Sequence, residues 1–422
     1  MFFKLSLLAE CQFWVTRAIG SLDSADGDAR LDSTLHAAFG LVQMLTGGIT
    51  EQIEPSLCRA LELAKKVRDV SGQLRMMDRL HLLYVLAGNF DGALDISRQG
   101  EAIAATHGDF VALARMQTSV SIAYHLLGHV PASRSYVDAA LLHSPGIDPD
   151  LHSHLNLDFP YRAKITFARI LWFQGYPEQA METARQVVGD VISIDHPVTL
   201  CRTLLWVFAV YYWNSELEEF EEYADRIMLE ARRYSIDYLQ AVGQGVKGIV
   251  RVARGDTGDG LVRIQDSVKK LHSHGYGPQT DFSVQLAETM LKAGKHDDAL
   301  EMTVTAIARA EQHNFMLERA ELLRLKGLAL IATKRPDVVR AVECLKQSLE
   351  LARRQRARGF ELRTAVSLAR LWQQEGRQRE ARDLLAPVYD RFTESFNTRG
   401  LTNARELLIE LDPPRSDLLA VH

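Results

Sequence analysis

The stretch ELRTAVSLARLWQQEGRQREARDLLAPV, residues Glu361–Val388, sets the pattern for the rest of the chain. Its large apolar residues recur three or four positions apart, which places them on one stripe of a helix. Gly376 predicts the end of a first helix, because glycine takes the left-handed conformation at no steric cost. The stripe resumes at Ala381, and the small side chains of Ala369 and Ala381 allow two helices to approach closely. The stretch therefore predicts a helical hairpin.

The same order of large, small and turn residues recurs, with substitutions, along the whole chain. Nine matches begin at residues 39, 80, 120, 167, 207, 247, 286, 326 and 368, so the period is close to 40 residues. This is the tetratricopeptide pattern, whose usual period is about 34 residues. We expect the additional residues to lie in longer helices and wider turns. The register predicts an all-α protein: an α-α superhelix of about nine helical hairpins.

The repeats divide the chain into four expected parts. Residues 1–30 would form an N-terminal helix and turn, an incomplete repeat whose apolar face lacks its partner helix. Residues 31–396 would hold the nine repeats, and residues 397–412 a capping helix. Prolines at 413 and 414 end that helix, because proline cannot continue it, and residues 413–422 are expected to be a disordered tail.

Composition argues against several classes of function. The net charge of −5 provides no global positive field for nucleic acid. No stretch reaches the roughly 18–20 apolar residues that a membrane span requires. The four cysteines share no close spacing, which is typical of buried thiols in a reducing cytosol and favours a cytoplasmic protein.

One polar insertion raises the question of a metal site. Residues 144–160, SPGIDPDLHSHLNLDFP, separate the third and fourth repeats and contain the possible ligands Asp148, Asp150, His152, His154 and Asp158. Histidine and carboxylate two residues apart can ligate a metal. Alternating polar residues in a surface loop are more often only solvated. We therefore expect no metal and no cofactor.

Catalytic motifs are also missing from the sequence. It contains no GxxxxGK[ST], GxSxG or HExxH pattern. A GxGxxG pattern runs from Gly243 to Gly248, but it falls inside the first helix of the sixth repeat and follows no strand. Its glycines predict close packing of helices. We expect no enzymatic activity.

The chain also resembles a known group of proteins. The resemblance is carried by LRTAVSLARLWQQEGRQREARDLLAPVYDRFTESF, from residue 362 to 396, and by Leu171–Ala180, Glu318–Gly327 and Ala341–Gln355. These blocks resemble the C-terminal helical-repeat region of large bacterial multidomain regulators. Such regulators join an adenylate or guanylate cyclase domain, or a winged-helix DNA-binding domain, to a nucleotide-switch ATPase. The resemblance runs from about Leu8 to Leu411, includes no catalytic residue, and implies a sensor or scaffold arm.

The first functional interpretation is a protein-interaction groove. By analogy with the family, the positions five and two residues before each repeat start, and two, five and six residues after it, face the concave side. The first of these positions holds the most regular signal. Arginine occupies it in four consecutive repeats and again at Arg363, and aromatic residues follow in repeats four and five. The candidate groove residues are Arg75, Arg115, Arg162, Arg202, Arg169, Trp172, Phe173, Tyr212 and Trp213. Guanidinium groups beside aromatic rings suit an acidic peptide or a terminal carboxylate.

Two alternatives stay open at this point. In the first, each arginine pairs with an acid of the adjacent helix, and the aromatic side chains fill the core. In the second, the chain senses a small effector bound in a closed cavity near Trp172 and Trp213, and controls a separate ATPase, cyclase or DNA-binding partner at its N-terminal end. A long open groove would favour the peptide, and a closed cavity would favour the effector.

Overall fold

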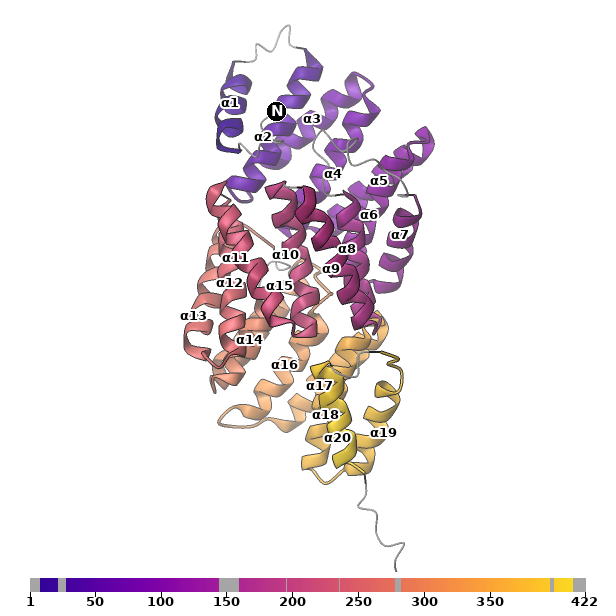
Figure 1. Ribbon diagram of the computed structural model, residues 1–422, viewed down its shortest axis with the longest axis vertical. Coiled ribbons are helices and arrows are strands. Elements are labelled where there is room, and N and C mark those ends of the chain that lie inside the picture. The colour runs from indigo at the N-terminus through magenta and orange to yellow at the C-terminus, as the bar shows by residue number, and fades with distance from the viewer. Residues whose placement is uncertain are drawn as a thin grey trace, which may run out of the picture.

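The computed structural model describes residues 8–21, 28–143, 159–194, 196–234, 236–277, 282–394 and 398–412 (Figure 1). Within these ranges the chain forms twenty α-helices and no strand. The helices are α1 (Leu8–Gly20), α2 (Ala29–Thr46), α3 (Ile53–Lys66), α4 (Val70–Ala87), α5 (Phe90–His107), α6 (Phe110–Leu126), α7 (Val130–Leu142), α8 (Phe159–Phe173), α9 (Pro177–Ile194), α10 (Pro197–Asn214), α11 (Leu217–Arg233), α12 (Asp237–Ala253), α13 (Thr257–Ser273), α14 (Ser283–Lys292), α15 (His296–Gln312), α16 (Arg319–Ala332), α17 (Val338–Gln355), α18 (Arg358–Gln374), α19 (Gln378–Tyr389) and α20 (Arg399–Glu410). The predicted fold class, an all-α superhelical solenoid, is confirmed.

The nine predicted hairpins correspond to the helix pairs from α2–α3 to α18–α19. In the last pair, Gly376 has a φ of +78° and ends α18, as its place in the sequence predicted. Ser215 takes the same left-handed conformation, with a φ of +63°, at the corresponding turn of the fifth repeat. Ala369 and Ala381 are completely buried, so the two helices of the hairpin meet at small side chains.

The GxGxxG segment lies within α12, as expected from the repeat register. A Cβ atom at Gly248 would lie 2.8 Å from the backbone oxygen of Gly260 on α13, and one at Gly243 would lie 2.4 Å from the Met228 side chain. Real Cβ atoms do not approach other atoms so closely. The glycines therefore allow neighbouring helices to pack, and this segment has no strand before it to form a dinucleotide site.

Successive turns of the superhelix touch each other, and the contacts follow a fixed order. The Ile49 amide of the first repeat donates to the His274 carbonyl oxygen of the sixth at 2.8 Å. The Gly88 carbonyl oxygen of the second repeat lies 3.1 Å from Nδ1 of His313 in the seventh. The amides of Met316 and Leu317, at the start of the eighth repeat, donate to the Leu126 carbonyl oxygen in the third at 3.1 and 3.2 Å. Each of these repeats thus meets the repeat five further along the chain.

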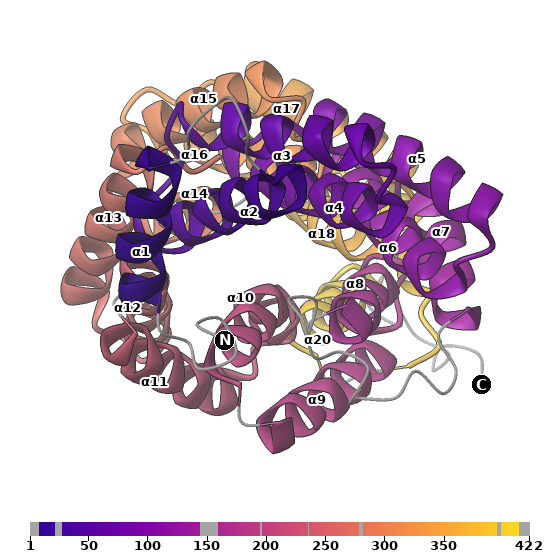
Figure 2. The ribbon, with the colours of Figure 1, turned by 90° about the horizontal axis from the view of Figure 1, so that it is seen from above.

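The fourth repeat meets the ninth in the same way. Glu394, just after α19, accepts hydrogen bonds from the backbone amides of Glu178 and Gln179 at 2.9 and 3.2 Å, at the first turn of α9. Figure 2, a view from above, shows the first helices α4, α6, α8 and α10 lying inside the second helices α5, α7, α9 and α11. The inner helices of the repeats therefore surround the superhelix axis.

Some sequence predictions fall outside the described ranges. These are the possible metal ligands Asp148, Asp150, His152, His154 and Asp158, and the tail at residues 413–422. Elsewhere, in the part of the chain that is described, no group of three or more histidine, cysteine or acidic side chains is placed to hold a metal ion. None of the described helices is long and apolar enough to cross a membrane.

Candidate functional site

The row of arginines predicted from the repeat register is brought together on the inner helices. Arg162 on α8 forms an ion pair with Asp78 on α4, with Nη1 and Oδ1 3.3 Å apart. Its Nη2 also donates to the Ser119 hydroxyl on α6 at 3.1 Å, and Ser119 bonds Asp78 at 3.0 Å. Three consecutive repeats are therefore connected through one carboxylate.

Asp78 stays ionised despite its burial. Burial raises the pKa of its carboxyl, but the nearby guanidinium groups of Arg162 and Arg115 outweigh that effect and bring the pKa to about 2. His81, one turn further along α4, is buried and has its pKa lowered to about 4, mainly by burial and then by Arg162. The cluster around Asp78 therefore carries its charge on one acid and several arginines.

The other arginines of the row differ in exposure. Arg75 is half-buried and lies 3.6 Å from Asp69, with a further bond to the Ser71 hydroxyl at 2.8 Å. Arg115 is buried, and burial lowers its pKa. Arg202 is half-buried and lines a small hollow with Arg162 and Trp206. The row is thus continuous, but most of its charge is held inside the protein.

The predicted aromatic residues form a packed cluster between two turns. The rings of Trp172 on α8 and Trp213 on α10 stack with centroids 4.5 Å apart. Phe173 and Phe360 pack edge-on against them, with Phe360 coming from α18 in the ninth repeat. A Cβ atom at Gly359 would lie 2.6 Å from the Trp172 ring. The cluster therefore joins the fourth and fifth repeats to the ninth.

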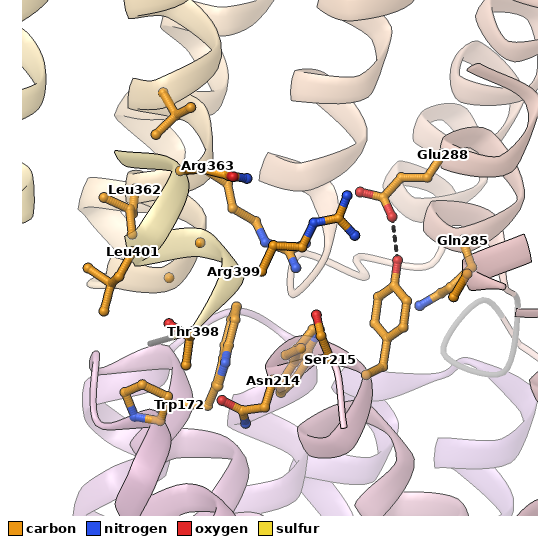
Figure 3. Close-up of a pocket in the computed structure, with 18 of the residues that line it drawn as sticks. Trp172, Asn214, Ser215, Gln285, Glu288, Leu362, Arg363, Thr398, Arg399 and Leu401 are labelled. Atoms are coloured by element: carbon orange, nitrogen blue, oxygen red, sulfur yellow. Dashed lines mark hydrogen bonds between the residues drawn. The ribbon is translucent and has the colours of Figure 1, made fainter. Parts of the chain in front are cut away.

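A pocket of about 300 Å³, the axial pocket, lies next to this cluster. Its walls come from the first helices of repeats four to nine and from the start of α20, as Figure 3 shows for Trp172, Glu288, Arg363 and Arg399. Its charged and aromatic lining residues are Trp172, Tyr212, Trp213, Glu288, Lys292, Arg324, Arg363, Phe392 and Arg399. The structure thus places four of the predicted site residues, Arg363 included, around one cavity.

A buried ionic network forms one wall of the axial pocket. Glu321, whose side chain is 1% exposed, lies 2.6 Å from Arg324 and 3.0 Å from Arg363. Arg324 also pairs with Glu288 at 3.2 Å. Burial raises the pKa of the Glu321 carboxyl, but Arg324 and Arg363 outweigh it and hold the pKa well below its usual value. Two arginines and two carboxylates therefore balance each other in this wall.

Tyr212 connects the network to α10. Its hydroxyl donates a hydrogen bond to Glu288, drawn as a dashed line in Figure 3. Burial and then Glu288 raise the pKa of Tyr212 well above its usual value, so the hydroxyl keeps its proton. The bond links the fifth repeat to the seventh across the pocket.

Positive charge is in excess in the described lining of the pocket. Arg399 and Lys292 are exposed to solvent and form no ion pair with any residue that the structure describes. With Arg324 and Arg363 they make four cations against Glu288 and Glu321, so two positive charges remain uncompensated. The first turn of α20 also faces the pocket. A helix N-terminus favours anions, as the free cations do.

Several residues of this site were not found from the sequence. Arg324 and Glu288 lie on the inner helices two residues before and after their repeat starts, at positions the family analogy treats as inward. One signal was available: Glu321 holds an acid where other repeats carry arginine, and Arg363 follows in the next repeat. An acid and an arginine at the same position of adjacent repeats predict a pair. Arg399 gave no such signal, because it belongs to α20 rather than to a repeat.

Comparison with known proteins agrees with the repeat assignment. A tetratricopeptide repeat family model matches residues 162–186 and 362–387, which fall in the fourth and ninth repeats. The chain thus contains tetratricopeptide-like repeats. No curated protein sequence matches it.

Solved structures with similar helical arrangements come from several kinds of protein. One is a signal transduction ATPase with numerous domains and a tetratricopeptide repeat sensor from Pyrococcus horikoshii, with 14% identity and a TM-score of 0.47, covering 92% of this chain and 56% of that one. Another is a Rap protein complexed with competence and sporulation factor, with 13% identity, a TM-score of 0.41, and coverage of 97% and 96%. A third is yeast Tom70, with 12% identity, a TM-score of 0.40, and coverage of 97% and 87%.

Proposed function

We propose that this chain is a non-catalytic sensor scaffold that binds a small anionic effector in the axial pocket. The observation that carries the proposal is the uncompensated positive charge of Arg399 and Lys292 in a cavity beside Trp172 and Trp213. Tetratricopeptide-like repeats form scaffolds for interaction or sensing. A cavity of about 300 Å³ has the size of small-molecule sites.

The chemistry of the pocket favours a compact anion with more than one negative charge. Arginine presents a planar set of donors that matches carboxylate and phosphate oxygens. Arg324 and Arg363 already hold carboxylates, so a bound anion would rely mainly on Arg399, Lys292 and the first turn of α20. Such an effector would lie where α8 and α18, from successive superhelical turns, come together.

This position suggests how binding would be relayed. An effector that bridges α20 and α14 would stabilise the closed contact between turns, and so favour one pitch of the superhelix over another. The regulators that the sequence resembles carry an ATPase with a cyclase or winged-helix domain. We propose that a protein of this kind, in the same chain or a separate one, is the partner that reads the change.

Citrate, a compact trianion, is a suitable probe. Added to the full chain, it should raise the melting temperature and change the tryptophan fluorescence, because Trp172 and Trp213 line the pocket. Arg399→Gln should weaken citrate binding at least about threefold, since it removes a charge without removing an ion pair. Arg405→Gln, an exposed arginine on the same helix but outside the lining, is the matched control. Equal affinity of both variants for citrate would contradict the proposal, as would a wild type that citrate does not affect.

A second candidate function rests on the continuous row of arginines. The partly exposed ones, Arg75 and Arg202, lie on the inner helices of the second and fifth repeats and would attract an acidic peptide. A glutamate-rich peptide should then bind the chain with marked salt sensitivity. Arg75→Glu together with Arg202→Glu should weaken that binding and leave citrate binding unchanged. Binding of the peptide that ignores both substitutions would exclude this second function.

A further inference from the structure

A second cavity of about 110 Å³, the Arg169 chamber, lies along the axis beside the axial pocket. The two share Tyr212, Ile249 and Gln285 as a partition. The chamber's other walls are almost entirely apolar and come from the second to the eighth repeat. Its described lining includes Leu86, Leu126, Trp206, Phe208, Phe282 and Phe315. Among the described lining residues, only Arg169 and Glu318 are charged.

Arg169 is held firmly but its charge is not paired. Its side chain is buried, with the residue 9% exposed, and its guanidinium lies over the rings of Trp206 and Trp213 at 4.8 and 5.5 Å. Nε donates to His125 Nε2 at 3.2 Å, and Nη1 to the Trp206 carbonyl oxygen at 3.5 Å. Among the described residues Nη2 makes no hydrogen bond, and the group forms no ion pair.

The histidine partner does not compensate the charge. His125 is completely buried, and burial followed by Arg169 holds its pKa well below its usual value, so the ring is neutral. Its Nε2 accepts from Arg169, which places the ring proton on Nδ1. Glu318 is half-buried in the chamber lining and acts on Arg169 only at longer range. The guanidinium is therefore a fixed cation without a close ion pair, in a chamber whose described lining is apolar apart from Glu318 and a few polar groups.

We infer that the Arg169 chamber binds the carboxylate of a small apolar acid. A buried charge that forms no close ion pair is costly, and a carboxylate bound to Nη2 would reduce that cost. The apolar walls would cover the body of the ligand, since small-molecule sites combine apolar surface with a few polar anchors. The site is distinct from that of the proposed effector, which needs several charges together with Lys292 of α14 and Arg399 of α20.

The size of the chamber limits the ligand. An engineered apolar cavity of about 150 Å³ in another protein holds benzene. The smaller volume here suits an aliphatic acid of about five carbons. Isovalerate is therefore the probe, and isovaleramide, with the same carbon skeleton and no charge, is the matched control ligand.

Titration of the full chain with isovalerate tests the inference. We expect isovalerate to change the fluorescence of Trp206 and Trp213 and to raise the melting temperature, and isovaleramide to bind at least about tenfold more weakly. Arg169→Met should fold, because replacing a buried charge with an apolar side chain of similar length is often tolerated. It should lose at least about tenfold in isovalerate affinity.

Two further variants separate the outcomes. Ala209→Phe would fill the chamber while keeping Arg169, and should also abolish isovalerate binding, which gives a second test if Arg169→Met fails to fold. Arg399→Gln, in the axial pocket, should leave isovalerate binding unchanged even where citrate binding falls. The inference is overturned if isovalerate does not bind the wild type, or if it binds Arg169→Met or Ala209→Phe as well as the wild type.

Discussion

The two buried ionic clusters use the same positions of the repeat and balance their charge differently. In the N-terminal half, Asp78 is bonded to Arg162 at 3.3 Å while Arg115 lies close by, so one acid serves several cations. In the C-terminal half, Arg324 and Arg363 share Glu321 and Glu288. The first cluster keeps a surplus of charge inside the inner layer. The second is neutral, which leaves the cations of the neighbouring pocket free to bind a ligand.

The largest expected effect is in the C-terminal cluster. Glu321→Gln would leave Arg324 and Arg363 with one carboxylate between them, and Glu321 is buried with short bonds to both. Breaking a buried pair by removing one partner costs about 3–5 kcal/mol. We expect urea unfolding followed by circular dichroism to show a loss of this size. Glu343→Gln, an exposed acid in the same repeat, should have little effect. Equal stability of both variants would mean that the network does not hold the repeats together.

Asp78→Asn should destabilise the N-terminal half by a smaller amount. The amide keeps the bond from Ser119, and the Asp78 side chain is 11% exposed and lies further from its arginine than Glu321 does. A charged hydrogen bond contributes about 1.5–3 kcal/mol, and we expect a loss in this range. Asp95→Asn on the exposed side of α5 is the control. If Asp78→Asn loses as much stability as Glu321→Gln, the number of arginines near an acid contributes more to stability than the length of its ion pairs.

The loss of stability at low pH should depend on the buried carboxylates of the two ionic clusters. The folded pKa of Asp78 is depressed to about 2, so its ionised form stabilises the fold above the pKa of the unfolded chain, near 3.8. That contribution is lost as the pH falls through this range toward 2. The Glu321 pKa is depressed in the same direction. We therefore expect Asp78→Asn to lose less stability than the wild type between about pH 4 and pH 2, measured by melting temperature. Parallel curves would contradict the assigned pKa direction.

Arg75→Gln should have the smallest effect. Its pair with Asp69 is 3.6 Å long and more than a third exposed on both sides. Exposed pairs contribute about 0–1 kcal/mol, so the melting temperature should shift little. A loss comparable with that of Asp78→Asn would show that the whole arginine row acts as one structural unit.

The repeat register could be predicted from the sequence because it depends on local patterns. Gly376, Ala369 and Ala381 each have a role that a single hairpin defines, and the structure confirms it. The contacts between turns could not be predicted. Ile49 and His274 meet because of the angle that accumulates over five repeats, and no short pattern records that angle.

In the candidate site, too, local patterns and contacts between distant repeats differ in what the sequence predicts. Trp172, Tyr212 and Trp213 were candidate groove residues because of their repeat positions, and in the structure they line the axial pocket. Their neighbours Phe360 and Arg399 come from 147 to 227 residues further along the chain and join the site only when the superhelix closes. Position within a repeat therefore does not predict which side chain of a distant repeat a residue meets.

The hydrogen bonds between successive turns of the superhelix form a regular series. Each of the first four repeats is hydrogen-bonded to the repeat five places further along the chain. The bonds are made at Ile49, Gly88, Leu126 and Glu178. At the fifth repeat the corresponding place, with Asn214 and Ser215 on one side and Thr398 and Arg399 on the other, is the axial pocket.

The pocket thus lies at the next position in this series of contacts between turns. In a linear repeat array each unit depends only on its neighbours. In a superhelix whose turns are bonded to each other, distant repeats are also coupled. The cooperativity of unfolding then depends on how many contacts between turns are formed. A ligand bound in the axial pocket would add one more contact between turns. Binding would then make the unfolding transition of the whole chain more cooperative.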